Sequence, residues 1–440
     1  MASVSQIAAA MEHVLTGTAE VIARQTRFVQ RQSKVGGSLF AKTMVLGWLG
    51  NPDSSLSNLA RVTAGLGVPN SYQGLDDRFS ERAADFLKQL LAASVGELIC
   101  AEPTAIAVLR RFSAVVIDDS TVVSLPDDLA RVWKGTGERT GHNQAAVKLA
   151  VRLDLLSGKL TGPLLDNGRG QDRSSPLQTT PLPPGSMRVT DLGFFSLPVL
   201  AELGADGSYW LSRLQVQTTV FDAKGRRVAV ERLLAAQKDS IVDIPVSLGA
   251  EQRLAARLLA ARVPQAVAQE RRHKLRAEAS HKGQPVSRAR LALADWTILV
   301  TNAPRDMLSL QEALVLARAR WQIELLFRLW KQHGGIDESR SANPWRILCE
   351  LYAKLLAMLI QHWFALLGVW SYPDRSLVKA AAAVRSNVAL LIAAFRGCLT
   401  MDAAIEQIRS ATPLGCRMNT RRKAPNTCQL LLALDHGGLA

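Results

Sequence analysis

The sequence predicts an α/β fold in which a sheet-forming middle lies between helical regions at both ends, and three observations predict it. Apolar residues recur at three-and-four spacing over residues 1–100 and again beyond 309, as on the buried side of a helix. The stretch "RRFSAVVIDDSTVVSL" at 110–125 is rich in β-branched residues, which is typical of a strand buried on both faces. Strand-like pieces then dominate 215–300.

Composition excludes disorder for most of the chain and favours an anionic partner. With 440 residues, 48% of them hydrophobic and 21% charged, the chain can form two or three domains with a large core. Its formal net charge of +15 favours a polyanionic partner, usually nucleic acid. A protein associated with the ribosome or a membrane surface, or simply a basic enzyme, is the alternative.

Cysteine use and hydropathy indicate a cytoplasmic protein with no membrane partner. The five cysteines lie far apart and form no Cys-x-x-Cys pair, so we expect a reducing compartment with neither a zinc site nor disulfides. Glu12 and His13 make the N-terminus a poor signal peptide. The apolar run at 355–370 is short for a membrane span and contains Gln361 and His362, so we expect a buried core helix.

The N-terminal helical pattern surrounds a segment that allows two interpretations. Between the apolar helices "SLFAKTMVLGWL" and "SERAADFLKQLLAASVGELI" lie two short helical segments separated by Gly65 and Gly67. A DNA-binding helix-turn-helix has this pattern, and so does any pair of packed helices. We assign residues 1–105 to a helical DNA-binding region.

The middle of the chain has a distinct order of elements. Residues 145–165 indicate two strands joined by a turn at 157–159, and 186–214 indicate a strand, a helix and a strand. Residues 215–300 form a predicted β-rich insertion with one hairpin and two further strands. It includes the strongly basic stretch 271–290. The chain beyond 309 is predicted to be helical to about 410.

The helical segment "RARWQIELLFRLWK" at 318–331 carries one glutamate among basic residues. At 100° per residue, Arg320, Glu324 and Lys331 fall within about 40° of one another, with Arg328 at the edge of the same stripe. Apolar side chains cover the other faces, so the segment is predicted to be packed on most sides. An ordinary amphipathic helix with an Arg–Glu pair four residues apart is the alternative.

Three further acids stand at strand ends, where burial makes acids costly. Asp118 and Asp119 follow the apolar run "SAVVI", and Asp191 ends the short strand "MRVT". Such acids often only cap helices or form turns. However, a ribonuclease-H-like catalytic core has the order of elements predicted here: three strands, then a strand ending in Asp, then a helix that carries a glutamate such as Glu324. Such a core gathers three carboxylates around two Mg²⁺ ions, which prefer hard oxygen ligands.

These motifs together resemble those of bacterial insertion-sequence transposases of the DDE type. "ARARWQIELLFRLWK" at 317–331 resembles the Tyr-Arg-Glu-Lys signature of the insertion-sequence-four family, except that Ala317 stands at the tyrosine position. "IDDST" resembles the first catalytic block and selects Asp119 over Asp118, and strand alternation lets only one of the two face a site. "VTDLGFFSLPVLAEL" resembles the second block and selects Asp191, and "DWTILVTNAP" resembles the strand that returns from the insertion.

The resemblance implies a function and a metal-binding triad. Asp119, Asp191 and Glu324 would be catalytic and would bind two Mg²⁺ ions, for which Mn²⁺ can substitute. The enzyme would bind the terminal inverted repeats of its element as a dimer and cut the DNA ends by hydrolysis. Relatives that have been studied form and reopen a hairpin before the 3′-end joins target DNA. Double-stranded DNA is the expected partner, and the absence of a phosphate-binding loop excludes a nucleotide cofactor.

Further residues are candidates for DNA contacts. The resemblance places Trp296 where relatives stack a tryptophan on a flipped base, and a core aromatic on a strand is the alternative. The basic stretch 271–290 and a second one, "RMNTRRKAPNT" at 417–427, are candidates for contacts with DNA phosphates, and solvated charged loops are the alternative for both. The full set of DNA-binding candidates is Arg320, Arg328, Lys331, Trp296, Arg271, Arg272, Lys274, Arg421, Arg422 and Lys423.

The implied domain order places the catalytic core in two parts on either side of the insertion. The first part spans 106–214 and the second 301–370, with the insertion at 215–300 between them. Residues 371–440 form a helical C-terminal region with a possible role in dimerisation. Two other functions stay open: a sequence-specific DNA-binding protein with an inactive core, and a ribonuclease-H-like nuclease without strand transfer.

Overall fold

The computed structural model describes residues 2–137, 144–281, 283–372, 374–419 and 425–435, and its contacts divide the chain into two units. The first unit comprises Met1–Ile106, Ser120–Gly170 and Trp321–Gln429. The second comprises Ala107–Asp119, Gln171–Arg320 and Leu430–Ala440. Both ends of the helical sequence therefore contribute to the same unit, whereas the predicted insertion lies wholly within the other.

The first unit consists mainly of helices, as the apolar spacing predicts. Ser55, Ser71 and Ser80 each accept a hydrogen bond from a backbone N–H of the helix that follows, which defines where those helices begin. The N-terminal elements are α1 (Val4–Glu12), the π-helix η1 (His13–Thr18), α2 (Ala19–Gln25), α3 (Gly37–Gly50), α4 (Leu56–Gly65), α5 (Tyr72–Asp76) and α6 (Glu81–Val95). The C-terminal elements are α13 (Trp321–Arg328), the π-helix η6 (Leu329–His333), α14 (Pro344–Gly368), α15 (Leu377–Ser386), α16 (Val388–Phe395), α17 (Met401–Ala411) and α18 (Thr427–Asp435), which continues past the unit boundary.

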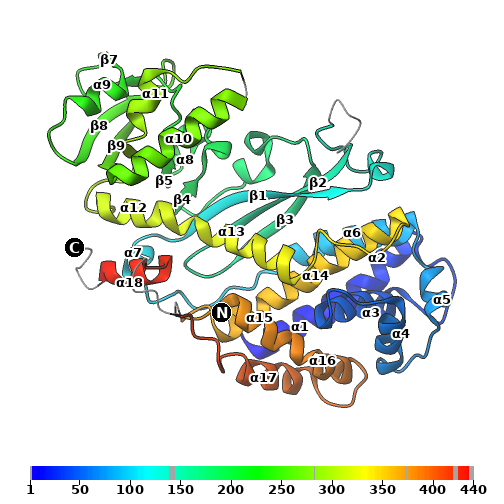
Figure 1. The fold of residues 1–440 in the computed structure, drawn as a ribbon. Helices are drawn as coiled ribbons and strands as arrows, with labels where there is room; N and C mark the ends of the chain where they lie inside the picture. The colour runs from blue at the N-terminus through cyan, green and yellow to red at the C-terminus, as the bar shows by residue number, and fades with distance from the viewer. Residues whose placement is uncertain (1, 138–143, 282, 373, 420–424, 436–440) are drawn as a thin grey trace. The chain divides into compact units, whose positions relative to one another are not determined.

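Helix α14 is the centre of the first unit. It packs against α3 and α6, and α1 packs against α17, so N- and C-terminal helices share one core (Figure 1). Among the described residues, α14 has the length and apolar character of a membrane span, as does the bent pair α15 and α16 if taken together. Because 89% of the most apolar window of α14 is buried inside the protein, it is the core helix that the sequence predicts.

The predicted hairpin at 145–165 is present in the first unit and docks on α14. Antiparallel strands β2 (Ala145–Asp154) and β3 (Leu160–Asn167) flank Gly158, which has a φ of +70°. A Cβ at Gly158 would lie 2.3 Å from Leu366 and 2.6 Å from Trp370, so the turn requires glycine for both space and conformation. In the strand order, β2 lies between β3 and β1 (Val115–Leu125). The 3₁₀ turn η2 (Asp127–Leu129) follows β1.

The second unit contains a mixed sheet with the strand order β1-β4-β5-β10-β9-β8-β6-β7. Strands β1, β4 and β5 pair in parallel, whereas β10, β9, β8, β6 and β7 pair antiparallel with their neighbours. The bounds are β4 (Met187–Thr190), β5 (Tyr209–Arg213), β6 (Val220–Phe221), β7 (Arg227–Val228), β8 (Ile241–Leu248), β9 (Leu254–Arg262) and β10 (Trp296–Thr301). The strand–helix–strand and the hairpin predicted from the sequence are confirmed.

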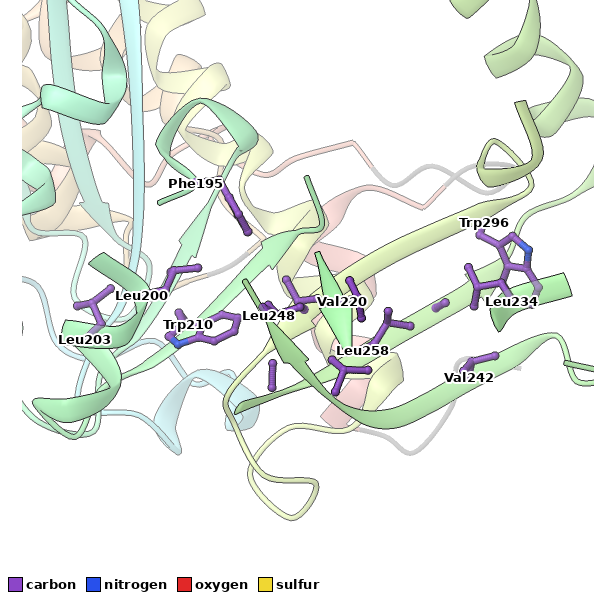
Figure 2. Packing of buried hydrophobic residues seen from close by; sticks show 14 residues of the cluster. Phe195, Leu200, Leu203, Trp210, Val220, Leu234, Val242, Leu248, Leu258 and Trp296 are labelled. Atoms are coloured by element: carbon purple, nitrogen blue, oxygen red, sulfur yellow. The ribbon is translucent and has the colours of Figure 1, made fainter. Parts of the chain in front are cut away.

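Helices in the second unit flank and connect these strands. The bounds are α7 (Ala107–Arg110), α8 (Leu197–Ala205), α9 (Val230–Ala235), α10 (Gln265–His281), α11 (Arg288–Leu293) and α12 (Leu310–Ala319), with 3₁₀ turns η3 (Asp172–Ser174), η4 (Pro176–Gln178) and η5 (Leu192–Phe194). Its buried cluster includes Trp210, Leu248, Leu258 and Trp296, and it extends from α8 along the antiparallel strands (Figure 2). The insertion is thus mixed rather than purely β, because most of the basic stretch 271–290 forms helices α10 and α11.

Candidate active site

Asp119 on β1 and Asp191 directly after β4 occupy matching positions in two neighbouring parallel segments. The register pairs Asp118 of β1 with Thr190 of β4, so the next residue on each strand is one of the two predicted metal-binding acids. Asp191 comes directly after β4 with extended backbone angles. Because successive side chains of a strand alternate between faces, Asp119 and Asp191 both lie opposite to the face that Asp118 and Thr190 occupy.

Arg320 contacts both of these carboxylates. Its Nη1 donates to Oδ2 of Asp119 at 3.0 Å, and its Nη2 lies 3.9 Å from Oδ2 of Asp191. Arg320 follows the last residue of α12, so this helix positions the guanidinium where the pairing of β1 with β4 ends. One cation therefore holds two acids that are separated by 72 residues in the sequence, and all three groups belong to the second unit.

The adjacent acid, Asp118, has a different environment. Its Oδ2 accepts a hydrogen bond from Nε of Arg188 at 2.8 Å and lies 2.7 Å from Nη2 of the same guanidinium. Arg188 also donates to Oε1 of Gln178 at 2.6 Å. The side chains of Arg188 and Asp118 are 1% and 0% exposed. This pair is part of the core, which supports Asp119 as the acid that faces the candidate site.

The segment 318–333 departs from the single regular helix that the 100° spacing assumes, and that prediction is wrong. Helix α12 ends at Ala319, α13 begins at Trp321, and the chain then forms the wider turns of a π-helix over Leu329–His333. The stripe of Arg320, Glu324 and Lys331 that 100° per residue predicts therefore does not extend to Lys331. Leu325, expected to be packed, has 38% of its surface exposed.

Glu324 and Lys331 belong to the first unit. Glu324 lies in the first turn of α13 and is half-buried. Nζ of Lys331 donates to the backbone carbonyl of Val122 on β1 at 2.9 Å, and both residues belong to the first unit. Arg328 lies over the ring of Trp321, with 5.9 Å between the guanidinium carbon and the ring centroid. Within the part of the chain that the structure describes, no three His, Cys, Asp or Glu side chains form a ready metal-binding group.

Trp296, the predicted base-stacking residue, lies in the core of the second unit. Only 6% of its surface is exposed, and it packs with Leu234 and Val242 (Figure 2). The guanidinium carbon of Arg262 is 4.7 Å from its ring centroid. This is the core-aromatic alternative stated above, and the ring would have to leave its cluster before it could stack on a base.

The basic stretch at 271–274 lies on α10, and each of its three candidate residues has a partner within the second unit. Arg271 donates to the carbonyl of Trp296 at 2.9 Å and to Oγ1 of Thr297 at 3.1 Å, and Arg272 pairs with Asp295. Burial, together with the neighbouring cation of Arg213, lowers the pKa of Arg271. Lys274 is exposed and pairs with Glu270. Arg421, Arg422 and Lys423 lie outside the described residues.

Comparison with known proteins shows the family to which the chain belongs. The family described as "Transposase DDE domain" matches residues 110–360, which is more than half of the chain and includes all three candidate acids. The chain belongs to the DDE transposase family. Domains of this family act in DNA transposition and generally use divalent metal ions.

Related transposases match along most of this transposase. A "Transposase for insertion sequence element IS231F" from Bacillus thuringiensis subsp. israelensis is 29% identical over 366 residues, covering 78% of this chain and 76% of the relative. The IS231C transposase from Bacillus thuringiensis subsp. berliner is also 29% identical, covering 79% and 77%. The IS1151 transposase from Clostridium perfringens is 22% identical, covering 77% and 76%. The chain is therefore a bacterial insertion-sequence transposase by family.

Sequence reasoning missed Arg188, the residue that separates the roles of the two adjacent acids. The sequence contained a signal, because "MRVT" places an arginine inside a short predicted strand. The structure shows that all four residues of this strand are buried. A buried arginine requires a nearby acceptor of opposite charge. Asp118, at the end of an apolar strand, was the available acid.

Proposed function

We propose that this transposase binds the terminal inverted repeats of its own insertion sequence and catalyses Mg²⁺-dependent strand cleavage and strand transfer in a ribonuclease-H-like core. The observation that carries the proposal is the convergence of Asp119 and Asp191 on the guanidinium of Arg320, at the point where the parallel pairing of β1 with β4 ends. Asp191 directly follows β4, and ligand sites of open α/β sheets commonly lie at the carboxyl ends of parallel strands. Glu324 completes the proposed triad from the first unit.

The available donor atoms suit divalent metal ions. Carboxylate oxygens are the ligands that Mg²⁺ and Mn²⁺ prefer, and two carboxylates already share one cationic group here. Asp119, Asp191 and Glu324 would hold the ions. Bound there, two ions would activate a water or a 3′-hydroxyl and stabilise the leaving oxygen of the phosphodiester.

The basic residues around the triad have separate tasks in this proposal. Arg320 balances the charge of Asp119 and Asp191 before DNA binds, and its planar fork suits the phosphate oxygens beside the scissile bond. Arg328 and Lys331 contact the DNA phosphates on either side of the scissile bond. Lys331 is held by the carbonyl of Val122, which lies three residues after Asp119 on the same strand.

Strand order supports the core assignment. The antiparallel pair β3-β2, followed by β1 and the parallel neighbours β4 and β5, is the sheet pattern expected of a ribonuclease-H-like core. The N-terminal region 1–105 is proposed to recognise the terminal repeats, and 371–440 to contribute to a dimer on DNA. The positive net charge favours both DNA ends and target DNA as partners inside the bacterial cell.

Purified protein tests the proposal with labelled duplexes that carry the ends of its own element. We expect cleavage at the end of the terminal repeat with Mg²⁺ or Mn²⁺, no cleavage in EDTA, and joined products when target DNA is added. Selective end binding without metal-dependent cleavage would support an inactive DNA-binding protein instead. Cleavage without hairpin or joined products would support a nuclease that lacks strand transfer.

A further inference from the structure

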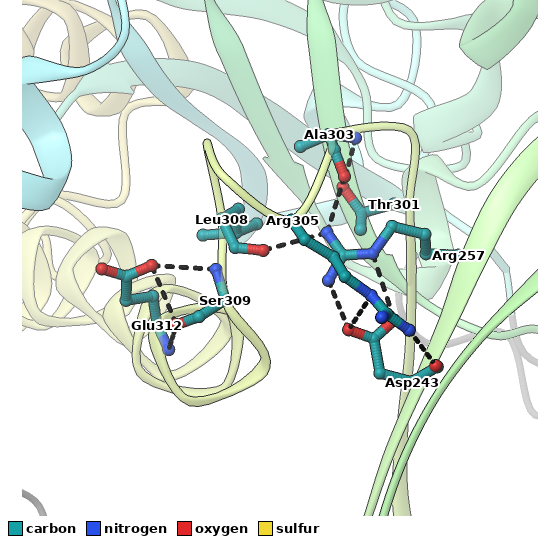
Figure 3. A network of polar contacts seen from close by, with 8 residues as sticks. All are labelled: Asp243, Arg257, Thr301, Ala303, Arg305, Leu308, Ser309 and Glu312. Atoms are coloured by element: carbon teal, nitrogen blue, oxygen red, sulfur yellow. Dashed lines mark hydrogen bonds and ion pairs between the residues drawn. The ribbon is translucent and has the colours of Figure 1, made fainter.

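The turn between β10 and α12 is held by one guanidinium from the insertion. Nη1 of Arg257, on β9, donates to the carbonyl of Ala303 at 2.7 Å and to the carbonyl of Leu308 at 2.9 Å (Figure 3). These two carbonyls lie near the beginning and the end of the turn. A single side chain therefore fixes the path by which the chain leaves β10 and enters α12.

Arg257 is itself oriented by Asp243 of β8. Its Nε donates to Oδ1 at 3.1 Å and its Nη2 to Oδ2 at 2.6 Å, so the contact is bidentate. Nε of Arg305, from within the turn, lies 3.1 Å from the same carboxylate (Figure 3). The side chain of Arg257 is 13% exposed. A lysine would not reproduce this set of contacts, because it lacks the rigid planar fork.

The first turn of α12 is fixed from the core side as well. Ser309 and Glu312 form a capping box, in which each side chain bonds the other's backbone N–H. Arg111, which precedes β1, lies 2.7 Å from the carboxylate of Glu312 and donates to the carbonyl of Met307 at 3.2 Å. Burial acts to raise the pKa of Glu312, but hydrogen bonds from Arg111 and Ser309 outweigh it and keep the pKa below its ordinary value.

The position of this turn matters because α12 leads directly to Arg320. At 1.5 Å per residue, the ten residues of α12 extend about 15 Å. A tilt of about 4° at its beginning would displace its end by about 1 Å, and a misplacement of about that size can reduce catalysis roughly 100-fold. Arg320 at that end contacts Asp119 and Asp191.

We propose that Arg257 is a positioning residue for strand cleavage, through which the insertion sets the place where Arg320 meets the two catalytic aspartates. The proposal rests on the proposed function, because it assigns catalytic value to the Arg320 contacts. Arg257 touches neither carboxylate, and it acts through the turn and α12. The insertion would then determine active-site geometry in addition to any contact that it makes with DNA.

The test compares Arg257→Gln with Arg226→Gln in the full-length protein. Arg226 is the matched control, because it also pairs with an aspartate of the insertion, Asp222, but lies in an exposed hairpin with 70% of its side chain accessible. For Arg257→Gln we expect hydrogen exchange over 303–312 to accelerate at least tenfold while exchange across β8 stays unchanged. Single-turnover end cleavage should fall at least tenfold, with affinity for the DNA ends within twofold of wild type. Arg226→Gln should match wild type within twofold in all three measurements.

Two outcomes would overturn the proposal. Faster exchange over 303–312 with cleavage still at the wild-type rate would show that the turn does not position the site. Faster exchange throughout β8 and β5 would show a role in overall stability only. If Arg257→Gln does not fold, Asp243→Asn removes the charged partner but leaves the carbonyl contacts, and the same results are expected of it. A wild-type protein that cleaves no DNA overturns the proposed function. Hydrogen exchange over 303–312, compared between Arg257→Gln and wild type without DNA, still decides whether Arg257 orders the turn.

Discussion

Arg188 and Asp118 form an ion pair of 2.7 Å in which both side chains are almost completely buried. The next residue, Asp119, lies on the opposite face of the strand and contacts Arg320 instead. Two adjacent acids of one strand thus have different partners, one in the core and one at the candidate active site.

Asparagine substitutions should separate the roles of the two acids. Asp119→Asn should reduce metal-dependent cleavage to background with little change in the free energy of unfolding. Asp118→Asn should lower that free energy by about 3–5 kcal/mol, because it removes the carboxylate that pairs with the buried charge of Arg188. Urea denaturation and a cleavage assay on both variants check this. The assignment fails if Asp118→Asn is stable and inactive while Asp119→Asn cleaves normally.

Removing Arg320 should increase the affinity of the protein for Mn²⁺ in the absence of DNA. Its guanidinium lies at 3.0 and 3.9 Å from the two carboxylates, where it competes electrostatically with any divalent ion. We expect Arg320→Gln to bind Mn²⁺ about tenfold more tightly, a modest effect for unit charges at this range in a partly solvated site. Electron paramagnetic resonance of free Mn²⁺ measures it, with Arg328→Gln as the control. Equal or weaker binding by Arg320→Gln would show that the pair of acids is not the metal site.

Titration of His362 should make the folded protein less stable in mild acid. Burial lowers its pKa to about 4, although the hydrogen bond to the carbonyl of Gly158 at 2.7 Å opposes the shift. The unfolded chain takes up this proton near pH 6.5, and the folded chain only near pH 4. Stability is therefore lost as the pH falls through this window, by about 3 kcal/mol in total.

The variant His362→Gln isolates this contribution, because glutamine can donate to the same carbonyl but does not titrate. Its free energy of unfolding, measured by denaturant titration between pH 7 and pH 4, should depend less on pH than that of wild type. A slope identical to that of wild type would assign the acid sensitivity to other groups.

Lys354 and Glu350 should stabilise the segment that follows the π-helix. Nζ of Lys354 lies 3.0 Å from the carboxylate of Glu350 and donates to the carbonyls of Gly335 at 2.7 Å and Glu338 at 2.9 Å. Lys354→Met should cost about 3–5 kcal/mol of unfolding free energy, because it leaves a buried carboxylate without its cation. Lys354→Met combined with Glu350→Leu should recover most of that loss in chemical denaturation. A double variant as unstable as the sum of the single variants would contradict this account.

Local patterns were sufficient to predict most elements, because each depended on residues close in sequence. The β-branched run of β1, the glycine turn at 157–159 and the apolar spacing of α14 all have the predicted structure. Strand β9 was not predicted, because "LAARLLAAR" lacks both alternation and β-branched residues. Its strand conformation depends on pairing with β8 and β10, which the local sequence does not encode.

The acids of the candidate site stay a prediction from motifs, whereas their contacts with other side chains could not be predicted from the sequence. Asp119 and Asp191 could be selected from their motifs, and the contact of Arg320 with both was not foreseen. Trp296 and Arg271 were candidates for DNA contacts, yet their side chains are engaged within the second unit. Arg257 could not be distinguished from other arginines, because its partners lie 14, 46 and 51 residues away in sequence.

The most direct test of the central claim is the cleavage activity of Glu324→Gln on DNA that carries the ends of the element. The substitution keeps the size of the side chain and removes the carboxylate, and Glu338→Gln, an exposed acid of the same unit, serves as control. We predict that Glu324→Gln binds the ends with wild-type affinity but shows no metal-dependent cleavage, while Glu338→Gln cleaves normally. Cleavage by Glu324→Gln at the wild-type rate would contradict the proposed triad.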